Sequence, residues 1–324
     1  MYFCTRKTRS QTMKKFLLIV LITASFAAAA QRPDMAVLSW NVENFFDTYN
    51  DTATLDDDFT PLGANHWNSK RYQAKRNNIA KVVAAADFPD IVALVEVEND
   101  YVLKDLCQGT PLYKQGYRFV HFDSPDPRGI DCALLYRNGR IALIEARPID
   151  VSIPEEDFYT RDILLVHTLV DSVLPAYFLV CHLPSKRGGE TAEQRRIGIA
   201  DTLCFILDSL RTAHPEALVM AMGDFNAAPD EINPAPPDFE NLMLRLPHDA
   251  GSYKYHGYWS FIDQVVLSDN FSPAAKVEVF QPDYLLTIDK KDHSRKPYRT
   301  YNGPAYQGGF SDHLPIRTCI DIER

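Results

Sequence analysis

The sequence predicts an α/β protein built on buried central strands. Short apolar runs such as residues 218–222 show no alternation and are bounded by turn-forming residues, which is typical of fully buried strands. Two longer segments, residues 70–86 and 191–211, carry apolar side chains at the spacing of one helix face. Polar side chains follow the strand runs directly, and strand ends that meet at one sheet edge are where layered α/β enzymes build their sites.

Polar residues that directly follow a predicted strand, called polar exits here, recur in order along the chain. Each predicted strand leads to a carboxylate, amide or imidazole group: Asn41 and Glu43 after residues 36–40, Glu96 and Glu98 after 91–95, His182 after 177–181, and Asp224 and Asn226 after 218–222. Two further runs contain such groups, with Asp263 inside residues 261–267 and Asp312-His313 inside residues 310–315. Any one of these groups is compatible with an ordinary cap or a satisfied core residue, but six exits in series favour a common site.

Residues 223–226 form the most informative of these exits. Asp224 and Asn226 lie two residues apart, on one face of an extended chain, and Gly223 permits close approach of backbone and ligand. A carboxylate beside an amide supplies the hard oxygen ligands that Mg²⁺ and phosphate sites need. Taken alone, the same residues also end strands by making turns.

Asp263 lies inside an apolar run, where a carboxylate is costly unless it is paired. His313 is the natural partner. We therefore expect an Asp263–His313 pair, in which the carboxylate fixes the tautomer and orientation of the imidazole.

The two predicted helices frame the site. Residues 70–86 place one apolar stripe inward, with four cations expected mostly outside it: Arg71, Lys75, Arg76 and Lys81. Residues 191–211 open with Thr191 and Gln194 as a predicted capping box and stop before His214-Pro215. Four histidines without motif context are interpreted as surface or core residues: His66, His121, His248 and His256.

The N-terminus is typical of a targeting segment. Lys14 and Lys15 precede a short apolar core and the small residues Ala28-Ala29-Ala30, so residues 1–30 are predicted to be an extension with a cleaved signal peptide. The apolar core is too short to span a bilayer. We expect residues 31–324 to form a single catalytic domain that is exported, periplasmic or secreted, with no transmembrane segment and no stable protein partner.

The charge balance excludes a binder that attracts nucleic acid over its whole surface. The 324 residues are 46% hydrophobic and 24% charged, with a net charge of −9. Residues 1–30 hold five basic and no acidic residues, so their removal leaves 29 Lys and Arg against 43 Asp and Glu, a net charge of −14. A polyanionic substrate therefore requires a local cationic rim. Five cysteines remain, with neither a disulfide framework nor a zinc spacing.

The ordered motifs resemble the endonuclease/exonuclease/phosphatase superfamily of deoxyribonuclease I-like enzymes. The resemblance rests on Trp40-Asn41-Val42-Glu43, Glu96, Cys181-His182-Leu183-Pro184, residues 223–226, Ile262-Asp263 and Ser311-Asp312-His313, and it spans residues 36–317. It implies a four-layer α/β sandwich, in which two packed mixed β-sheets are flanked by helices, with the site at one rim.

The resemblance also implies roles for the site residues. Glu96 would be the main carboxylate ligand of Mg²⁺ or Mn²⁺, helped by Asn41 and Asp312, with Glu43 a weaker candidate. Asp224 and Asn226 would position the attacking water and the phosphate, while His182 would contact the phosphate or assist the leaving group. His313, held by Asp263, would act as a base or as an electrophilic clamp, and the sequence leaves both roles open.

The substrate predicted from the sequence is nucleic acid. Asn226-Ala227-Ala228-Pro229 resembles the nuclease-type branch and departs from the pattern of inositol-phosphate 5-phosphatases. Lys186 and Arg187 follow His182 closely and are predicted to contact the substrate. Residues 290–299 alternate basic and aromatic side chains, as backbone clamps with base stacking do, and a solvated loop is the alternative interpretation of this segment.

Two alternatives to a metal-dependent nuclease stay open. A sphingomyelinase-like lipid phosphodiesterase, or another phosphoesterase, is the first, although we expect no exposed aromatic hairpin of the kind that inserts into a membrane. A non-catalytic binding module on the same fold is the second. It is disfavoured because a degenerate site need not retain the complete set of polar residues.

Overall fold

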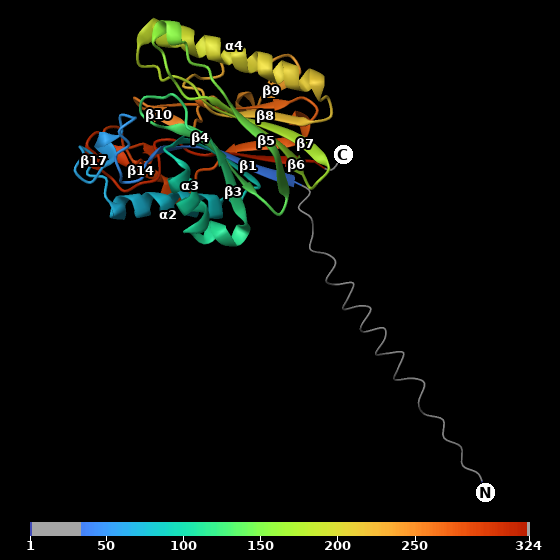
Figure 1. The fold of residues 1–324 in the computed structure, drawn as a ribbon, viewed down its shortest axis with the longest axis horizontal. Coiled ribbons are helices and arrows are strands. Elements are labelled where there is room, and N and C mark those ends of the chain that lie inside the picture. The colour runs from blue at the N-terminus through green and yellow to red at the C-terminus, as the bar shows by residue number, and fades with distance from the viewer. Residues whose placement is uncertain (2–33, 323–324) are drawn as a thin grey trace.

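A computed structural model describes Met1 and residues 34–322 of the chain. Apart from Met1, the predicted signal peptide lies outside these residues. Two six-stranded sheets form the centre of the fold (Figure 1). The first has the order β13 (Ala275–Val279), β18 (Ile316–Asp321), β1 (Asp34–Phe45), β2 (Ile91–Val97), β4 (Asp131–Arg137), β3 (Tyr117–His121). The second has the order β5 (Ile141–Ile149), β6 (Ile163–Val170), β7 (Leu174–His182), β8 (Leu218–Asp224), β12 (Asp263–Ser268), β9 (Phe239–Asn241).

Both sheets are mixed. β1 and β2 run parallel and are joined through helix α2 (Ser69–Ala85), and β7 and β8 run parallel and are joined through helix α4 (Gly189–Ala213). A parallel pair requires such a crossover, whereas antiparallel neighbours can be joined by short turns. A third helix, α3 (Asp100–Gln108), follows β2.

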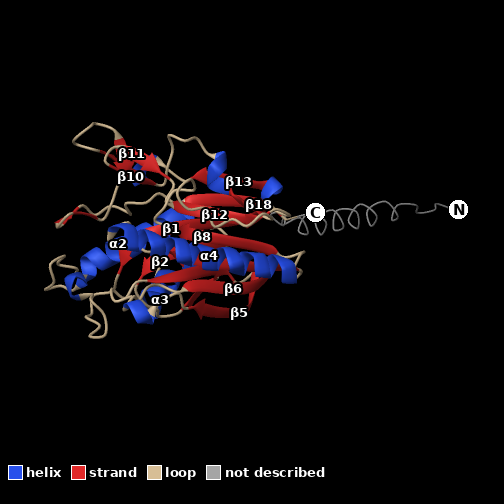
Figure 2. Cartoon of the chain, turned by 90° about the horizontal axis from the view of Figure 1, so that it is seen from above, coloured by secondary structure: helices blue, strands red, loops and turns tan. Residues whose placement is uncertain are grey.

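Shorter elements decorate the two sheets. Three small hairpins are β10 (Tyr253–Tyr255) with β11 (Tyr258–Ser260), β14 (Leu286–Ile288) with β15 (Arg295–Pro297), and β16 (Tyr301–Asn302) with β17 (Ala305–Tyr306). Six 3-10 turns complete the described elements: η1 (Asp57–Phe59), η2 (Pro111–Gln115), η3 (Pro154–Glu156), η4 (Leu242–Arg245), η5 (Ser272–Ala274) and η6 (Asp283–Leu285). Figure 2 shows the β10–β11 hairpin standing away from the two large sheets.

Three apolar cores hold the layers together. Val37, Val95 and Met220 belong to the core between the two sheets. Trp40 and Leu94 face the other way, into the core shared with α2 and α3, and a third core lies between the second sheet and α4. Strands buried on both faces have no solvent side, so their sequences are continuously apolar. The predicted four-layer α/β sandwich is confirmed, with α4 outside one sheet and α2 and α3 outside the other (Figure 1).

Both long helices differ from the predictions in their N-terminal ends, and α2 also differs in one buried residue. α2 begins at Ser69, where the Asn68 side chain accepts hydrogen bonds from the amides of residues 70 and 71. Lys75, predicted to lie mostly outside the buried stripe, is only 1% exposed. The predicted capping box at Thr191 is wrong, because α4 begins at Gly189 and its N-cap residue, Gly188, makes no side-chain cap. No helix in the described part of the chain has the length and apolarity needed to span a membrane.

Candidate active site

The site lies where the core between the sheets ends at one rim. On β8, Met220 and Met222 point into that core, and Asp224 takes the next inward position. His182 follows Val180 in the same way on β7. The strand registers pair His182 with Asp224 and Asp224 with Asp263, so three polar groups lie side by side on adjacent strands.

Close contact between β7 and β8 explains the glycine that precedes Asp224. Gly223 has φ 138°, and a Cβ atom at this position would lie 1.9 Å from the carbonyl oxygen of Cys181. Only glycine fits there without moving the backbone. After the strand, Asn226 takes φ 48° and donates from its amide to the carbonyl of Leu183 at 2.9 Å, while its backbone NH donates to Asp224 Oδ1 at 2.8 Å. The exits of β7 and β8 are thereby tied together.

Asn41 brings the first sheet into the site. Its amide nitrogen donates to Asp224 Oδ2 at 3.0 Å and to Glu96 Oε1 at 3.3 Å, so one side chain links a carboxylate from each sheet. Glu96 lies at an irregularity of the β1–β2 and β2–β4 ladders and has φ 65°. Its other oxygen accepts from the backbone NH of Asn44 at 2.9 Å. The distortion turns Glu96 toward the rim.

The structure brings His313 and Asp263 together, as the sequence predicts. His313 Nδ1 lies 2.7 Å from Asp263 Oδ2, and Ser252 donates its hydroxyl to the same oxygen at 2.5 Å. The backbone of His313 is held as well, because its carbonyl accepts from Trp40 Nε1 at 3.0 Å and its NH donates to Ser311 Oγ at 3.0 Å. The imidazole therefore has one fixed orientation, with Nε2 toward the cleft.

Asp224 lies between two imidazoles. Its Oδ2 is 3.6 Å from His182 Nε2 and 3.8 Å from His313 Nε2. Burial raises the pKa of Asp224 to about 7, and the charge of Asp263 acts in the same direction, although the charge of His313 and the hydrogen bonds from Asn226 and Asn41 oppose it.

The two histidines have pKa values that move in opposite directions. Burial lowers the pKa of His182 well below its ordinary value, and the charges of Arg161 and Arg128 lower it further. Burial also acts to lower the pKa of His313, but the carboxylates of Asp263 and Asp224 outweigh it and raise this pKa well above its ordinary value. Two buried imidazoles in one site thus differ in the protonation state that the protein favours.

Two of the four predicted metal ligands, Glu96 and Asp312, present carboxylates to the cleft, and a third, Asn41, lies beside Glu96. Such hard oxygen donors suit Mg²⁺ or Mn²⁺. In the present arrangement Asn41 directs its NH₂ group at the carboxylates, while its oxygen accepts from the backbone NH of Glu43 at 2.9 Å. Asn41 would therefore ligate a cation only after its amide turns over.

Glu43 lines the cleft as well, but its carboxylate is tied to the backbone and side chain of residues 299 and 300. One of its oxygens accepts from the backbone NH of Thr300 at 2.5 Å, and the other accepts from Arg299 Nε at 3.2 Å. Arg299 also donates to Asp312 Oδ2 at 2.9 Å. Glu43 thus holds the loop that carries Arg299, and we leave it out of the proposed metal ligands.

Lys75 and Arg299 are charged neighbours of the site whose contacts the sequence analysis did not predict. Lys75 Nζ donates to Thr300 Oγ1 at 2.6 Å and to the carbonyl of Phe310 at 2.7 Å, which ties α2 to the segment leading to Asp312. The helical spacing of the sequence did indicate that Lys75 is buried, because it follows Tyr72 by three residues and precedes Ile79 by four, on the same apolar stripe. For Arg299 the sequence offers only its place in a basic segment.

A cleft of about 760 Å³ opens above these groups. Its lining includes His182, Asp224, Asn226, Asp312 and His313, and also Lys186 and Arg187 as predicted. The Lys186 ammonium is paired with Glu231 at 2.6 Å, so its charge is offset, whereas Arg187 forms no ion pair with another described residue.

Residues 290–299 do not form the predicted clamp. Arg299 alone among them lines the cleft. Arg295 forms an ion pair with Asp283, and Lys296 forms one with Asp289 at 3.0 Å, so these cations are used within their own segment. Apart from Arg299, the basic and aromatic residues of this segment therefore do not line the cleft.

The sequence analysis did not identify an exposed aromatic hairpin beside the site, β10–β11. The β10–β11 hairpin carries Tyr253, Tyr255 and Tyr258 into the lining of the cleft, with Tyr255 63% and Tyr258 80% exposed. His256, interpreted from the sequence as a surface or core residue, lies at the tip of this hairpin and also lines the cleft.

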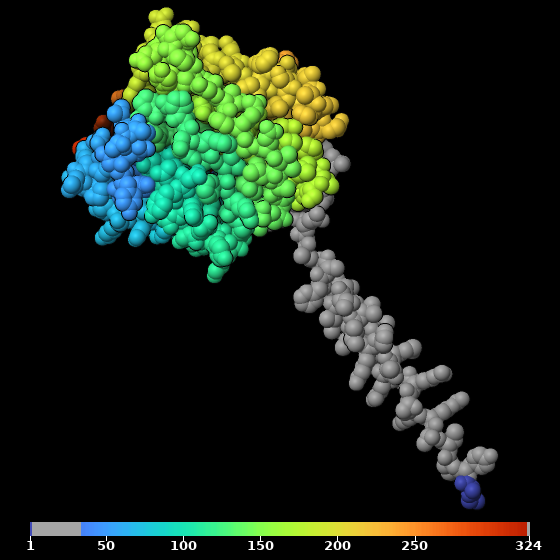
Figure 3. Space-filling view, viewed as in Figure 1, coloured from blue at the N-terminus to red at the C-terminus, as the bar shows by residue number. Residues whose placement is uncertain are grey.

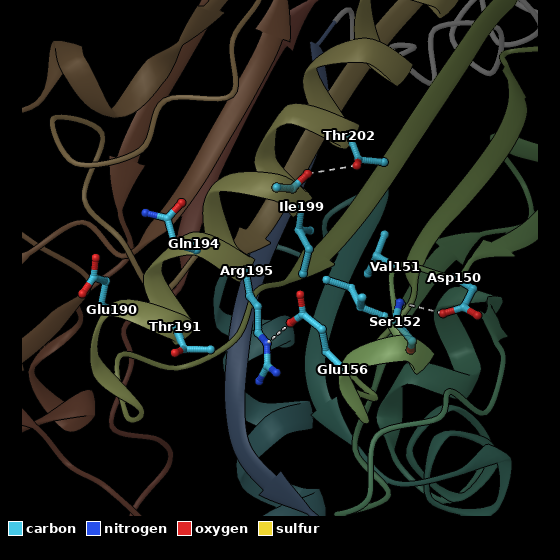
Figure 4. Close-up of a pocket in the computed structure, with 12 residues that line it drawn as sticks. Asp150, Val151, Ser152, Glu156, Glu190, Thr191, Gln194, Arg195, Ile199 and Thr202 are labelled. Carbon is cyan, nitrogen blue, oxygen red and sulfur yellow. Dashed lines mark hydrogen bonds and ion pairs between the residues drawn. The ribbon is translucent and has the colours of Figure 1, made fainter.

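A second groove, of about 670 Å³, is unrelated to these residues. It lies between α4 and residues 150–156 and contains the Arg195–Glu156 ion pair, at 3.3 Å (Figure 4). Figure 3 shows α4, in yellow, along the upper edge of the molecule, next to the green segments of the chain. None of the predicted site residues lines this groove.

One further cluster could be mistaken for a metal site. His121, Asp123 and Asp131 bring potential ligand atoms within 4.8 Å of one another. Both nitrogens of His121 are already engaged, with Asp100 at 3.0 Å and with Asp131 at 3.2 Å. The two carboxylates hold this imidazole as an ion pair, consistent with its interpretation as a structural histidine.

Comparisons with known proteins agree with this geometry. The sequence profile of the Endonuclease/Exonuclease/phosphatase family matches residues 36–323. Among solved structures, an endonuclease/exonuclease/phosphatase family protein of Bacteroides thetaiotaomicron is 16% identical, with a TM-score of 0.57, covering 90% of this chain and 96% of its own.

Two other solved structures share the fold. TDP2 of D. rerio, solved with a single-strand DNA product, is 20% identical, with a TM-score of 0.54 over 89% of this chain and 98% of its own. A mannosyl-6-phosphatase of Bacteroides thetaiotaomicron is 16% identical, with a TM-score of 0.55 over 88% and 99%. Among curated proteins none matches this chain. On its sequence profile and its fold, the chain belongs to the endonuclease/exonuclease/phosphatase family, whose members hydrolyse phosphoesters.

Proposed function

We propose that this chain is a divalent-metal-dependent phosphodiester hydrolase that cuts nucleic acid as an endonuclease. The observation that carries the proposal is the meeting of two sets of groups in one cleft. The Asp263–His313 pair and Asp224 meet the hard oxygen donors Glu96 and Asp312 there, with Asn41 linking Glu96 to Asp224 and Asp312 lying 4.0 Å from His313 Nε2.

Hydrolysis of a phosphodiester must orient a water, stabilise charge on the phosphate oxygens and assist the leaving oxygen. Glu96 and Asp312, with Asn41, would hold Mg²⁺ or Mn²⁺, and the bound cation would neutralise charge on the phosphate. Asp224 and Asn226 present a carboxylate and an amide to the cleft, and in this proposal they orient the attacking water.

The histidines contact the phosphate in this proposal. Because Asp263 engages Nδ1 of His313, the nitrogen left for the substrate is Nε2, which faces Asp224 and the cleft. His182 enters from the neighbouring strand with Nε2 near the same Asp224 oxygen. The phosphate would therefore lie beside Asp224, in reach of two imidazoles whose positions are fixed by the strands and by Asp263.

Nucleic acid is the substrate that the surroundings of the cleft support best. Arg128 and Arg187 line the cleft, which gives a local cationic rim on an anionic chain, while the charge of Lys186 is offset by Glu231. A polyanion with regularly spaced phosphates would gain from several such contacts. The likeness to a TDP2 solved with a single-strand DNA product supports the same class. With the predicted signal peptide, we propose that the enzyme acts outside the cytoplasm.

The test is a hydrolysis panel on the purified protein with added Mg²⁺ or Mn²⁺. It compares plasmid DNA, RNA, sphingomyelin, inositol phosphates and bis-p-nitrophenyl phosphate, with Asp224→Asn as a matched inactive control. We expect nicking of the plasmid and hydrolysis of bis-p-nitrophenyl phosphate, both lost in the variant. Cleavage of sphingomyelin with DNA and RNA left intact would overturn the nuclease proposal.

A lipid phosphodiesterase is the second candidate, and one observation favours it. The β10–β11 hairpin exposes two tyrosines beside the cleft, which is a feature that could rest on a membrane surface. The activity of such an enzyme would depend on detergent or vesicle surface and hardly on salt. The activity of a nuclease would depend on salt and hardly on detergent or vesicles.

A further inference from the structure

The β10–β11 hairpin has two chemically different faces. Its strands pair Tyr253 with Ser260, Lys254 with Trp259 and Tyr255 with Tyr258. Side chains on a strand alternate between faces, so the first and third pairs share one face and the second pair lies on the other. All four residues of the first face line the cleft. This face, defined by Tyr253, Tyr255, Tyr258 and Ser260, is called the tyrosine face below.

The opposite face is used for anchoring. Lys254 Nζ donates to the carbonyl of Arg295 at 2.9 Å and lies 5.5 Å from the centre of the Trp259 ring. Lys254 also donates to the hydroxyl of Ser294. The hairpin is therefore pinned by its Lys254–Trp259 face to residues 294–295, and its tyrosine face is the one left toward the cleft.

The tyrosine face continues directly from the catalytic histidine. Tyr253 forms an isolated β-bridge with His313, and the two rings have centroids 4.8 Å apart. Tyr255 stacks on Tyr253 at 6.5 Å with an interplanar angle of 14°. A row of rings thus leads from His313 outward, and its outer members are largely exposed. Exposed aromatic rings beside a reaction centre form a platform on which a flat ligand group can stack.

We propose that Tyr255 and Tyr258 stack against the nucleobase that adjoins the cleaved phosphate, so that the enzyme prefers single-stranded nucleic acid. This inference rests on the proposed function. A stacked base has to be unpaired and turned out of a duplex, and stacking on aromatic side chains is how sequence-independent single-strand binders hold bases. Arg187 and Arg128 also line the cleft, where they can contact the backbone phosphates while the rings hold the base.

The details of the hairpin favour a base over a lipid surface. Insertion into a membrane needs large apolar side chains at an exposed tip. The tip here is His256-Gly257, both with positive φ, and the single tryptophan of the hairpin faces the anchored side. The exposed rings carry hydroxyl groups and belong to the lining of a charged cleft.

The experiment separates binding from hydrolysis. Binding of a fluorescent oligothymidylate and of an abasic oligomer of the same length is measured in EDTA, and cleavage of both is then measured with Mg²⁺. The variants are Tyr255→Ala and Tyr258→Ala, with Tyr255→Phe as the conservative variant. Tyr113→Ala is the matched control, because Tyr113 is 70% exposed and lies outside the cleft.

The expected result is selective. Each alanine variant should weaken oligothymidylate binding by about tenfold, in line with the loss of one stacked base, and should leave the abasic oligomer unchanged. Tyr255→Phe and Tyr113→Ala should behave as the wild type. Equal binding of the two oligomers by the wild type, or equal losses on both in the variants, would overturn the platform.

Failure of the platform and failure of the proposed function give different results. Base-dependent binding without cleavage of any oligomer would leave the platform in place and reject the nuclease. Cleavage of both oligomers with no effect of the alanine variants would support the nuclease and reject the platform. If the alanine variants lose binding to vesicles of phosphatidylcholine and sphingomyelin while oligothymidylate binding is unchanged, the tyrosine face binds lipid and the inference is wrong.

Discussion

His313 Nδ1 and Asp263 Oδ2 lie 2.7 Å apart, although the two residues are 50 positions apart in the chain. Asp263 begins β12, and His313 lies in the segment before β18, so the pair joins the two sheets across the rim. Both side chains are buried. A buried carboxylate and a buried imidazole each cost free energy when alone, and each satisfies the other here.

The pair should act as one unit. His313→Ala should lower kcat by at least ~10²-fold, the scale of a positioned acid, base or charge stabiliser. Asp263→Asn should cost nearly as much, because the amide would no longer fix the tautomer of His313. The double variant should be no worse than either single one. Steady-state kinetics on bis-p-nitrophenyl phosphate measure this, and losses that simply multiply would show that the two residues act independently.

Divalent cations should be required for activity. EDTA should abolish hydrolysis, and Mg²⁺ or Mn²⁺ should restore it, because the proposed ligands are hard oxygen donors. Glu96→Gln should raise the cation concentration needed for half-maximal activity without changing the melting temperature by more than a few degrees. Glu98→Gln is the matched control, since Glu98 accepts from the backbone NH of Asp47 and lies outside the cleft lining. Full activity in metal-free buffer would reject the proposed mechanism.

The strand-exit groups could be predicted from the sequence because their positions follow from local rules. A continuously apolar run indicates a strand buried on both faces, and a polar residue that directly follows it lies at the end of that strand. A carboxylate inside an apolar run such as that of Asp263 requires a partner, and His313 is the residue that meets this requirement. The four-layer arrangement itself came from the resemblance of the ordered motifs, since periodicity gives the elements and not their stacking.

The missed features depend on tertiary placement. Lys75 lies on the buried stripe of α2, although its charge favoured an exposed position. The acceptors on Thr300 and Phe310, together with nearby carboxylates, make its burial tolerable. The hairpin was readable locally, since His256-Gly257 interrupts an aromatic alternation, as a two-residue turn does. That its tyrosines face the cleft follows from contacts with residues 294–295 and 313, which no local pattern reveals.

Lys75 should make stability depend on pH in the alkaline range. Burial lowers its pKa from 10.5 to about 8, although Glu43, Asp312 and Glu96 oppose the shift. Between these two values the unfolded chain holds a proton on Lys75 that the folded chain has released, so the free energy of unfolding rises with pH. The full change is roughly 3 kcal/mol for this one group.

Lys75→Met isolates this effect. Denaturant unfolding at a series of pH values should show the wild type gaining stability relative to the variant as pH rises above about 8, with a constant difference below that value. Tyrosines and cysteines that titrate in the same range are present in both proteins and cancel in the difference. A difference that stays constant through the alkaline range would show that Lys75 keeps its ordinary pKa in the folded chain.

Binding of nucleic acid should depend on salt through Arg187 more than through Lys186. The Lys186 ammonium lies against both oxygens of Glu231, at 2.8 and 2.6 Å, so the pair contributes little net charge to the cleft. Arg187 lines the same cleft and forms no ion pair with another described residue. Arg187→Gln should therefore raise KM for DNA and flatten its dependence on salt, because one phosphate contact is lost.

Lys186→Gln alone should also raise KM, since it leaves the charge of Glu231 facing the substrate. The paired change Lys186→Gln with Glu231→Gln should return KM close to the wild-type value. Hydrolysis of bis-p-nitrophenyl phosphate should be unchanged in all three variants. If the paired change lowers affinity as much as Lys186→Gln alone, Lys186 contacts the phosphate backbone itself and the assignment of the rim to Arg187 is wrong.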